Sequence, residues 1–178
     1  MSKTIIYKQN IKTPLGDMIA CASEDGVCFL DFVGRKNFDR LFTSMVNMIN
    51  GEIIEIQNNE NLKPYNIIIR LEKELDEYFS GKRKEFTVPL ITTGTEFQNK
   101  VWNELLRIPY GKTISYKEEA EKINQKNAFR AVANANGKNK LSIIIPCHRV
   151  IASDGKLSGY GGGVDKKKFL ISLEKNNI

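Results

Sequence analysis

The chain has 178 residues, 41% of them hydrophobic, so it is long enough for one ample core or two small ones. No apolar run approaches the length of a membrane span, and the first ten residues contain no signal-peptide core, which indicates a soluble, cytoplasmic protein without a membrane partner. The net charge of +6 is unevenly placed. Residues 1–90 hold 12 Lys and Arg against 13 Asp and Glu, whereas residues 91–178 hold 15 against 8. This asymmetry favours a polyanion-binding face in the second half, although a lysine-rich solvated surface would give the same count.

The first half of the chain reads as an α/β pattern. Three β-rich runs, residues 5–11, 17–23 and 27–33, are separated by turns at Pro14–Gly16 and Asp25–Gly26, which predicts antiparallel hairpins. Apolar residues at helical spacing predict a helix over 38–49, and residues 52–57 form another strand candidate. A second helix opens at Pro64 and ends near Gly81.

Residues 82–94 resemble a connector, after which the pattern becomes helical. Capping boxes at Thr95–Gln98 and Ser115–Glu118 predict one helix lined by apolar residues as far as Ile108 and a short one to about Ile123. Asn127 is the expected cap of a third helix that runs toward Asn136 and stops at Gly137. Two short helices joined by a tight turn make a helix-turn-helix pattern, which many helical domains also contain.

The third predicted helix carries small residues around one long side chain. Ala128, Ala131, Ala133 and Ala135 surround Arg130. Small residues allow close packing against a neighbouring protein helix, and they equally allow close approach to DNA with Arg130 as the one long side chain.

The cysteines are Cys21, Cys28 and Cys147, an odd number in a chain without a secretion signal, so we expect no disulfide framework. A structural zinc needs four ligands, and the only histidine is His148, so we expect no metal. Cys21 and Cys28 suit the interior as small hydrophobes.

Cys147 and His148 follow the apolar run 142–146. The thiolate is the reactive form of cysteine, His148 is the obvious base, and Arg149 adds positive charge. Adjacent residues in an extended chain point to opposite sides, so contact between the two needs a turn or a bridging water, and an acid must orient the imidazole. By itself the pair is also compatible with a buried structural cysteine.

Residues 155–163 contain five glycines, with Tyr160 as the only aromatic residue. Such a loop offers backbone amides and one stacking face to a planar ligand, but it does not match a nucleotide-cofactor loop. Asp165 is the expected cap of a final helix whose apolar face holds Phe169, Leu170 and Leu173.

Several motifs in residues 81–178 together resemble the O6-alkylguanine-DNA alkyltransferases, also called methylated-DNA–protein-cysteine methyltransferases. They are GTEFQNKVW at 94–102, IPYGKTISY at 108–116, FRAVANAN at 129–136, IIIPCHRV at 143–150 and GYGGG at 159–163. The first 80 residues add only a compatible α/β pattern.

The resemblance implies two domains. Residues 1–90 would form an α/β domain with a small antiparallel sheet, and residues 91–178 a mainly helical domain with a winged helix-turn-helix. The implied activity is single-turnover, irreversible DNA repair, in which an alkyl group passes from O6 of guanine, or O4 of thymine, to Cys147. The base would first be flipped out through the minor groove. The partner would be double-stranded DNA containing O6-alkylguanine, with the protein a monomer without cofactor, associated with the nucleoid in a prokaryote or nuclear in a eukaryote.

The resemblance also implies residue roles. Cys147 would be the acceptor, deprotonated by His148 through a water, with Glu174 orienting His148. Tyr116 would help protonate guanine N3, and Asn139 would brace the turn between the recognition helix and the reactive strand. Arg130 would fill the gap in the base stack. The other implied DNA contacts are Ala131, Ala133, Asn134 and Lys138. The base pocket would comprise Tyr116, Val150 through its carbonyl, Leu157, Tyr160 and Gly161.

The chain departs from the family pattern at four positions that bear on the fit to DNA. Asn124 and Lys126 replace a frequent Gly and Pro, Ala133 replaces Gly, and Lys140 replaces Pro. The zinc ligands that some relatives carry in the first domain are missing. Three alternatives predict different behaviour: a lesion binder without a reactive cysteine, a winged-helix regulator that prefers particular DNA sequences, and a cysteine hydrolase that turns over repeatedly.

Overall fold

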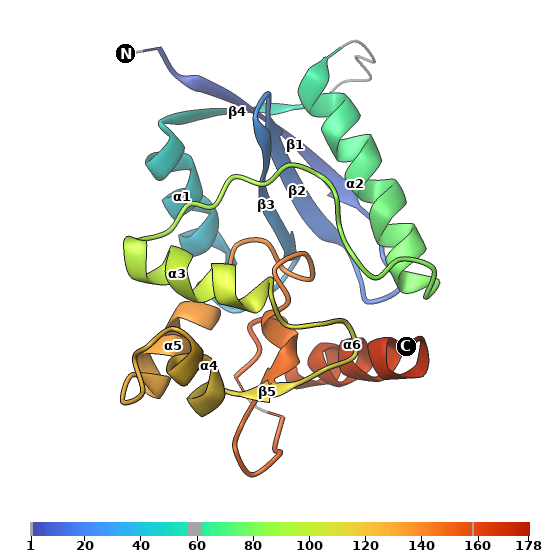
Figure 1. Ribbon diagram of the computed structural model, residues 1–178. Coiled ribbons are helices and arrows are strands. Elements are labelled where there is room, and N and C mark those ends of the chain that lie inside the picture. Colours follow the sequence, from blue (N-terminus) through green and yellow to red (C-terminus); the bar gives the residue numbers. More distant parts are fainter. Residues whose placement is uncertain (1, 57–61, 158) are drawn as a thin grey trace. The chain divides into compact units, whose positions relative to one another are not determined.

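The computed structural model describes residues 2–56, 62–157 and 159–178 (Figure 1). The chain divides into two compact units, Met1–Thr93 and Gly94–Ile178. The first is a sheet flanked by helices and the second is mainly helical, which confirms the predicted fold class. Among the described residues, no helix is long and apolar enough to cross a membrane.

The first unit is built on a four-stranded sheet. Its strands are β1 (Thr4–Ile11), β2 (Met18–Ser23), β3 (Gly26–Phe32) and β4 (Gly51–Glu55), in the order β3-β2-β1-β4. The first three pair antiparallel as predicted, but β4 pairs parallel to β1, so the sheet is mixed. The strand candidate 52–57 is therefore found at 51–55, and Gln57 lies outside the described residues. A parallel pair needs a crossover, which the segment 33–50 supplies.

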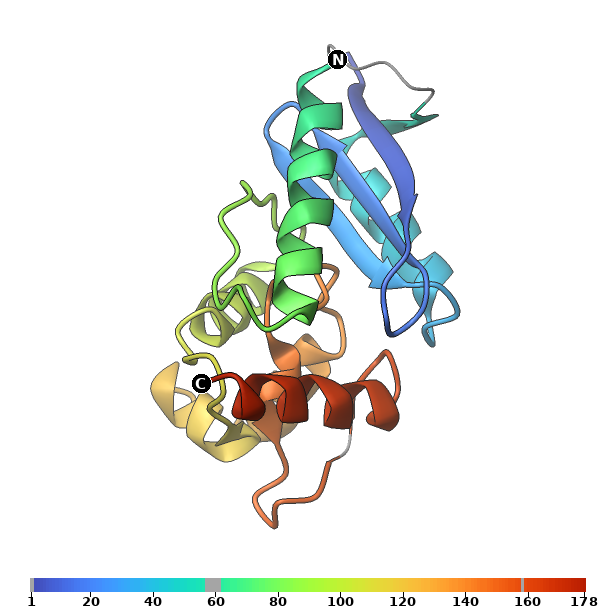
Figure 2. The ribbon, with the colours of Figure 1, turned by 90° about the vertical axis from the view of Figure 1, so that its right-hand side faces the viewer.

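Two helices cover opposite faces of this sheet, α1 (Phe38–Ile49) and α2 (Lys63–Phe79) (Figure 2). All seven residues of β3 are buried, as expected for a strand covered on both faces. The cluster on the α1 face consists of Ile6, Cys21, Cys28, Phe29, Leu41 and Met45. Ile68, Leu71 and Leu75 of α2 are buried at helical spacing, and Pro64 lies in the first turn as expected.

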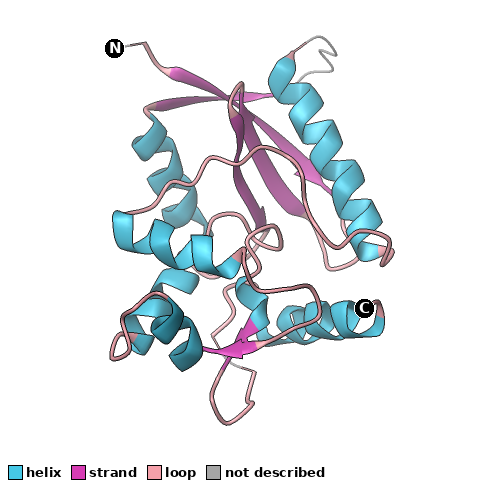
Figure 3. Cartoon of the chain, viewed as in Figure 1, coloured by secondary structure: helices cyan, strands magenta, loops and turns pink. Residues whose placement is uncertain are grey.

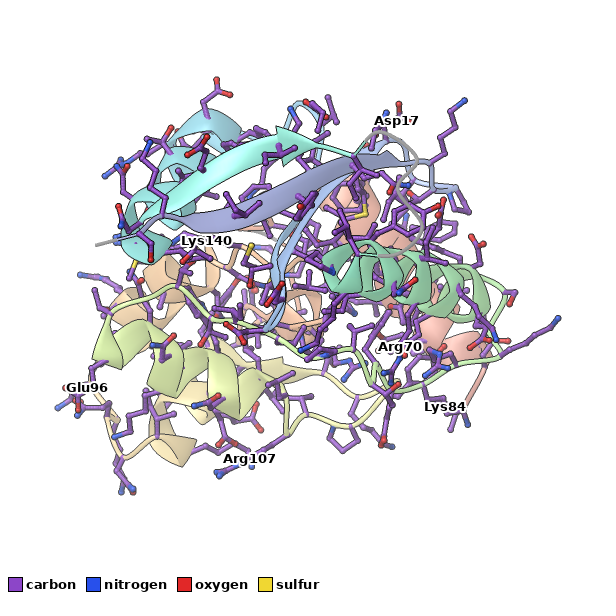
Figure 4. The ribbon with its side chains drawn as sticks, turned by 90° about the horizontal axis from the view of Figure 1, so that it is seen from above. Asp17, Arg70, Lys84, Glu96, Arg107 and Lys140 are labelled. Atoms are coloured by element: carbon purple, nitrogen blue, oxygen red, sulfur yellow. The ribbon has the colours of Figure 1, made fainter. Side chains whose placement is uncertain are left out.

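The connector that follows α2 is fixed to the first unit by Glu74. This buried carboxylate accepts hydrogen bonds from the Thr87 backbone N–H at 2.7 Å and from its hydroxyl at 2.5 Å. Arg70, labelled in Figure 4, donates to Glu74 at 3.1 Å and to the Thr87 carbonyl at 2.9 Å. Val27 also forms a bridge with Leu90. These contacts explain why the first unit extends through Thr93.

The described residues of the second unit form four α-helices and a short parallel strand pair (Figure 3). In chain order the elements are α3 (Glu96–Leu105), β5 (Ile114–Ser115), α4 (Tyr116–Lys122), α5 (Phe129–Asn136), a 3-10 turn (Cys147–Arg149), β6 (Val150–Ile151) and α6 (Val164–Asn176). Both predicted capping boxes are present, at Thr95 with Gln98 and at Ser115 with Glu118. They start α3 and α4 where the sequence places them.

Three predicted helix boundaries are wrong. Ala128, without a side-chain cap, precedes α5 in place of Asn127, and Gly163 precedes α6 in place of Asp165. Gly163 has φ of 102°, a conformation that suits glycine, so it fixes the turn into α6 two residues early. α3 ends at Leu105, and Ile108 is buried in the turn that follows.

The predicted apolar face of α6 is wrong at Phe169, which is 41% exposed. Leu170 is buried and Leu173 half-buried as expected, and the buried side of the helix also holds Lys167 and Glu174. The segment before Cys147 is not a strand. Residues 142–145 form turns, and Ile143 adopts a positive φ of 72°. Its neighbours Ile144 and Ile145 are buried, so this run packs into the interior without pairing as a strand.

Candidate active site

Cys147 opens the 3-10 turn and is buried, with 7% of its surface exposed. Asn139, fully buried, holds the approach to it. The Asn139 side-chain oxygen accepts the Leu141 N–H at 2.9 Å, and its Nδ2 donates to the Ile145 carbonyl at 2.8 Å and to the Cys147 Sγ at 3.3 Å. One amide therefore ties both ends of the 141–147 turn together and donates a hydrogen bond to the sulfur.

His148 and Glu174 meet across 26 residues of sequence. The turn directs the fully buried His148 toward α6, where its Nε2 lies 2.6 Å from the Glu174 Oε1. Arg149 binds the same carboxylate with two nitrogens, at 2.9 Å and 3.1 Å, and donates to the Ile108 carbonyl at 2.6 Å. The Gly111 backbone N–H adds a further bond to Glu174 at 3.0 Å. Each carboxylate oxygen of Glu174 therefore has two hydrogen-bond partners.

These contacts set the charges of the pair. Burial alone would raise the pKa of Glu174, but the hydrogen bonds and charges of His148 and Arg149 outweigh it and lower that pKa to about 2. Burial lowers the pKa of His148, against the opposing effect of Glu174. An ionised Glu174 accepts from the Nε2–H of a neutral His148. The Nδ1 lone pair of that tautomer is buried and has no hydrogen-bond partner among the described residues.

A lysine that the sequence analysis did not select lies beside Tyr116 and Val150. Lys167 is fully buried, donates to the Val150 carbonyl at 2.5 Å, and its Nζ lies 5.6 Å from the centre of the Tyr116 ring. Burial, with smaller contributions from Cys147 and Glu119, raises the pKa of Tyr116 to about 12, so the phenol keeps its proton. Burial lowers the pKa of Lys167, whereas the charge of Cys147 raises it.

Sequence reading missed Lys167 because it stands in a run of three lysines. A signal was present, since Lys167, Leu170 and Glu174 have the i, i+3, i+7 spacing of one helix face. Arg149 was read only as nearby positive charge, and its two bonds to Glu174 join residues 25 apart.

The residues predicted to meet DNA lie on α5. Arg130, Ala131 and Asn134 are exposed and Ala133 is half-buried, with the exposed Lys138 two residues beyond the helix. Val132 and Ala135 form its buried side, and the Trp102 indole N–H donates to the Ala135 carbonyl at 2.9 Å. The helix therefore packs on α3 through one side and leaves a side of small, polar and cationic residues exposed.

The predicted base-pocket residues come from two segments. Tyr116 begins α4, and Val150, Leu157, Tyr160 and Gly161 lie in or after β6. Val150 and Tyr160 are buried, whereas Leu157 and Gly161 are half-buried. A Cβ added to Gly159 would approach the Tyr116 hydroxyl to 3.1 Å, so the glycine lets this loop pass close to the phenol.

The fold and the site together define a class of protein. Its members combine a helix pair that exposes a cationic side with a buried cysteine that accepts a hydrogen bond. Two family models match the chain. Residues 6–92 match the ribonuclease-like domain of 6-O-methylguanine DNA methyltransferase, and residues 96–176 match its DNA-binding domain. The chain belongs to the 6-O-methylguanine DNA methyltransferase family.

Relatives match along most of the chain. A protein of Methanosarcina barkeri called methylated-DNA–protein-cysteine methyltransferase is 42% identical, over 97% of this chain and 99% of its own. An inducible protein of the same name from Bacillus subtilis is 43% identical, over 82% and 79%. The crystal structure of the O6-methylguanine methyltransferase of Mycobacterium tuberculosis has a TM-score of 0.78 and 34% identity, covering 97% of this chain and 94% of its own. The Mycobacterium tuberculosis protein has also been solved in complex with DNA.

Proposed function

We propose that this protein repairs DNA by moving the alkyl group of O6-alkylguanine irreversibly to the sulfur of Cys147. The observation that carries the proposal is the buried Cys147 Sγ, held at 3.3 Å from the Asn139 amide and followed directly by the His148–Glu174 pair. The same centre would accept the alkyl group of O4-alkylthymine. Family membership and the DNA complex of a relative support double-stranded DNA as the partner, which the protein would bind as a monomer.

His148 is the base in this mechanism. Its Nε2–H is bound by Glu174, so Nδ1 accepts the thiol proton of Cys147 through one water molecule. The thiolate then attacks the alkyl carbon, a carbon–sulfur bond forms, and the bond to O6 breaks with its electron pair going to guanine. The Tyr116 phenol, whose pKa is about 12, is protonated at neutral pH. It donates this proton to guanine N3 as the bond to O6 breaks. Because the thioether is stable, one molecule acts once.

The alkylated base must leave the duplex before Cys147 reaches it, at a cost of a few kcal/mol. The exposed side of α5 supports this step. Its small residues, Ala131 and Ala133, let the helix enter the minor groove, and Arg130 occupies the space that the flipped base vacates. Asn134 and Lys138 extend the same side toward the phosphates. Val150, Leu157, Tyr160 and Gly161 then enclose the base beside Tyr116.

Peptide mapping after reaction with DNA containing O6-methylguanine tests the assignment. We expect one methyl group, on the peptide that carries Cys147. Cys21 and Cys28 serve as internal controls, because burial raises the pKa of both thiols, that of Cys28 to about 12. The Cys147→Ser variant should receive no methyl group. A methyl group on Cys21 or Cys28 in the wild-type protein would contradict the proposal, and repeated release of methyl product would indicate a hydrolase.

A further inference from the structure

An exposed aromatic ring stands at the start of α5, directly before Arg130. Phe129 is the first residue of the helix and is 45% exposed, although phenylalanine usually enters the core. The Arg130 guanidinium carbon lies 5.7 Å from the centre of the Phe129 ring, within the range of a cation–π contact. The ring therefore contacts Arg130, the side chain that fills the gap in the base stack in the proposed function.

The rest of the exposed side of α5 cannot hold Arg130 in this way. Ala131 and Asn134 are the other exposed residues of the helix, and neither has an aromatic ring to attract a guanidinium. The residue that precedes the helix, Ala128, provides no side-chain cap, and no acidic residue lies in the first turn. Phe129 is thus the exposed neighbour on α5 able to restrict the Arg130 side chain, and an arginine loses much conformational freedom when it becomes fixed.

We propose that Phe129 is a positioning residue that holds Arg130 ready to enter the base stack. The inference rests on the proposed function and adds a second residue to the base-flipping step. In the complex, the ring accompanies the guanidinium into the opened minor groove and covers the unstacked base pair beside the gap, as apolar residues do in other minor-groove proteins. Since an aromatic face attracts a cation and stacks on any base, this function needs a ring rather than mere hydrophobicity.

Single-turnover rates of four variants on two substrates test the proposal. The variants are Phe129→Leu, Phe129→Tyr, Arg130→Ala and the double variant Phe129→Leu/Arg130→Ala. The substrates are duplex DNA with O6-methylguanine and free O6-benzylguanine, which needs no flipping. We expect Phe129→Leu to slow duplex repair roughly 3- to 30-fold, and Phe129→Tyr to retain the wild-type rate. The reaction with the free base should not change, which also shows that the Cys147 centre is folded.

The double variant decides whether Phe129 acts through Arg130. If it does, Phe129→Leu adds little once Arg130 is alanine. Phe169→Leu is the matched control, because Phe169 is a similarly exposed aromatic residue, 41%, on α6. Any of three results would overturn the inference. Phe129→Leu could repair duplex DNA at the wild-type rate, it could slow both substrates equally, or it could slow duplex repair as much in the Arg130→Ala background as in the wild-type protein. If Arg130→Ala itself slows both substrates equally, the flipping function assigned to α5 is wrong instead.

Discussion

At the scale of single residues, three buried charged or titratable side chains depend on one another. Arg149 and His148 both bind Glu174, and all three are buried. A buried ion pair adds little over well-packed apolar residues, but removing one partner leaves the other charge uncompensated in a low dielectric. Glu174 therefore has two functions, orienting the imidazole and neutralising Arg149.

The variant Glu174→Gln tests the second of these functions, the neutralisation of Arg149. We expect the free energy of unfolding to fall by about 3–5 kcal/mol, because Arg149 stays buried without its counter-charge. The matched control is Glu55→Gln, which breaks the exposed pair with Lys8 and should change stability by less than about 1 kcal/mol. Urea unfolding of the three proteins measures both changes. Equal stability of Glu174→Gln and the wild-type protein would show that Arg149 does not need the carboxylate.

The variant His148→Ala removes the proposed base. Transfer to Cys147 should slow by about 10²–10⁴-fold, the usual contribution of general acid–base catalysis. Since the base acts on the thiol and not on the duplex, rates with O6-methylguanine DNA and with free O6-benzylguanine should fall together. Rapid-quench measurement of both rates provides the comparison. An unchanged rate with the free base would exclude His148 as the base.

At the scale of elements, sequence predicts best what neighbouring residues decide. The capping boxes at Thr95 and Ser115 involve side chains three residues apart, and both helices begin there. The family resemblance implies a reactive strand before Cys147, but residues 142–145 form turns. Their path depends on Asn139, whose bonds to Leu141, Ile145 and Cys147 form only in the folded unit. Likewise, no local pattern joins Arg149 to Glu174.

A buried polar pair joins the two helices of the helix-turn-helix. Glu119 of α4 is fully buried and accepts a hydrogen bond from the Asn136 Nδ2 at 2.7 Å. The second carboxylate oxygen of Glu119 and the amide oxygen of Asn136 are both buried without a hydrogen-bond partner among the described residues. A proton on Glu119 resolves this, since the acid then donates to the Asn136 carbonyl. Burial raises the pKa of Glu119 to about 8, with Asn136 lowering it and Glu104 raising it.

This pKa predicts how stability depends on pH. An unperturbed glutamate titrates near pH 4.5, so between about pH 4.5 and 8 the folded protein binds more protons than the unfolded one. Its contribution is complete below that range and is lost as pH rises to 8, by at most about 1.4 kcal/mol per pH unit. In Glu119→Gln the amide keeps both hydrogen bonds but does not titrate.

Urea unfolding at pH 5 and pH 8 tests this prediction. Relative to the wild-type protein, Glu119→Gln should gain stability as pH rises from 5 to 8. Glu104, the other carboxylate near Glu119, pairs with Arg107, an exposed residue in the turn that follows α3 (Figure 4). Glu104→Gln therefore shows how much of the pH dependence comes from that neighbour. Parallel curves for Glu119→Gln and the wild-type protein would mean that Glu119 is ionised throughout.

At the scale of the whole molecule, positive charge is concentrated in residues 91–178. Binding to phosphates releases counterions, so affinity for undamaged duplex should fall steeply with salt and vary little with sequence. If four phosphates are contacted, the dissociation constant should rise at least about a hundredfold between 50 and 200 mM salt. Fluorescence anisotropy with duplexes of different sequence measures this. A flat salt response, or strong preference for one sequence, would favour a transcription regulator.

The stoichiometry of transfer shows whether Cys147 is the acceptor and whether each molecule reacts only once. Duplex DNA carrying radiolabelled O6-methylguanine is added in increasing excess to a fixed amount of protein, and protein-bound label is counted together with any released methyl product. We predict a plateau of one methyl group per molecule, no released product, and no label on Cys147→Ser. Label that stays on the wild-type protein after Cys147 is blocked, or product that accumulates beyond one equivalent, would contradict irreversible transfer to this cysteine.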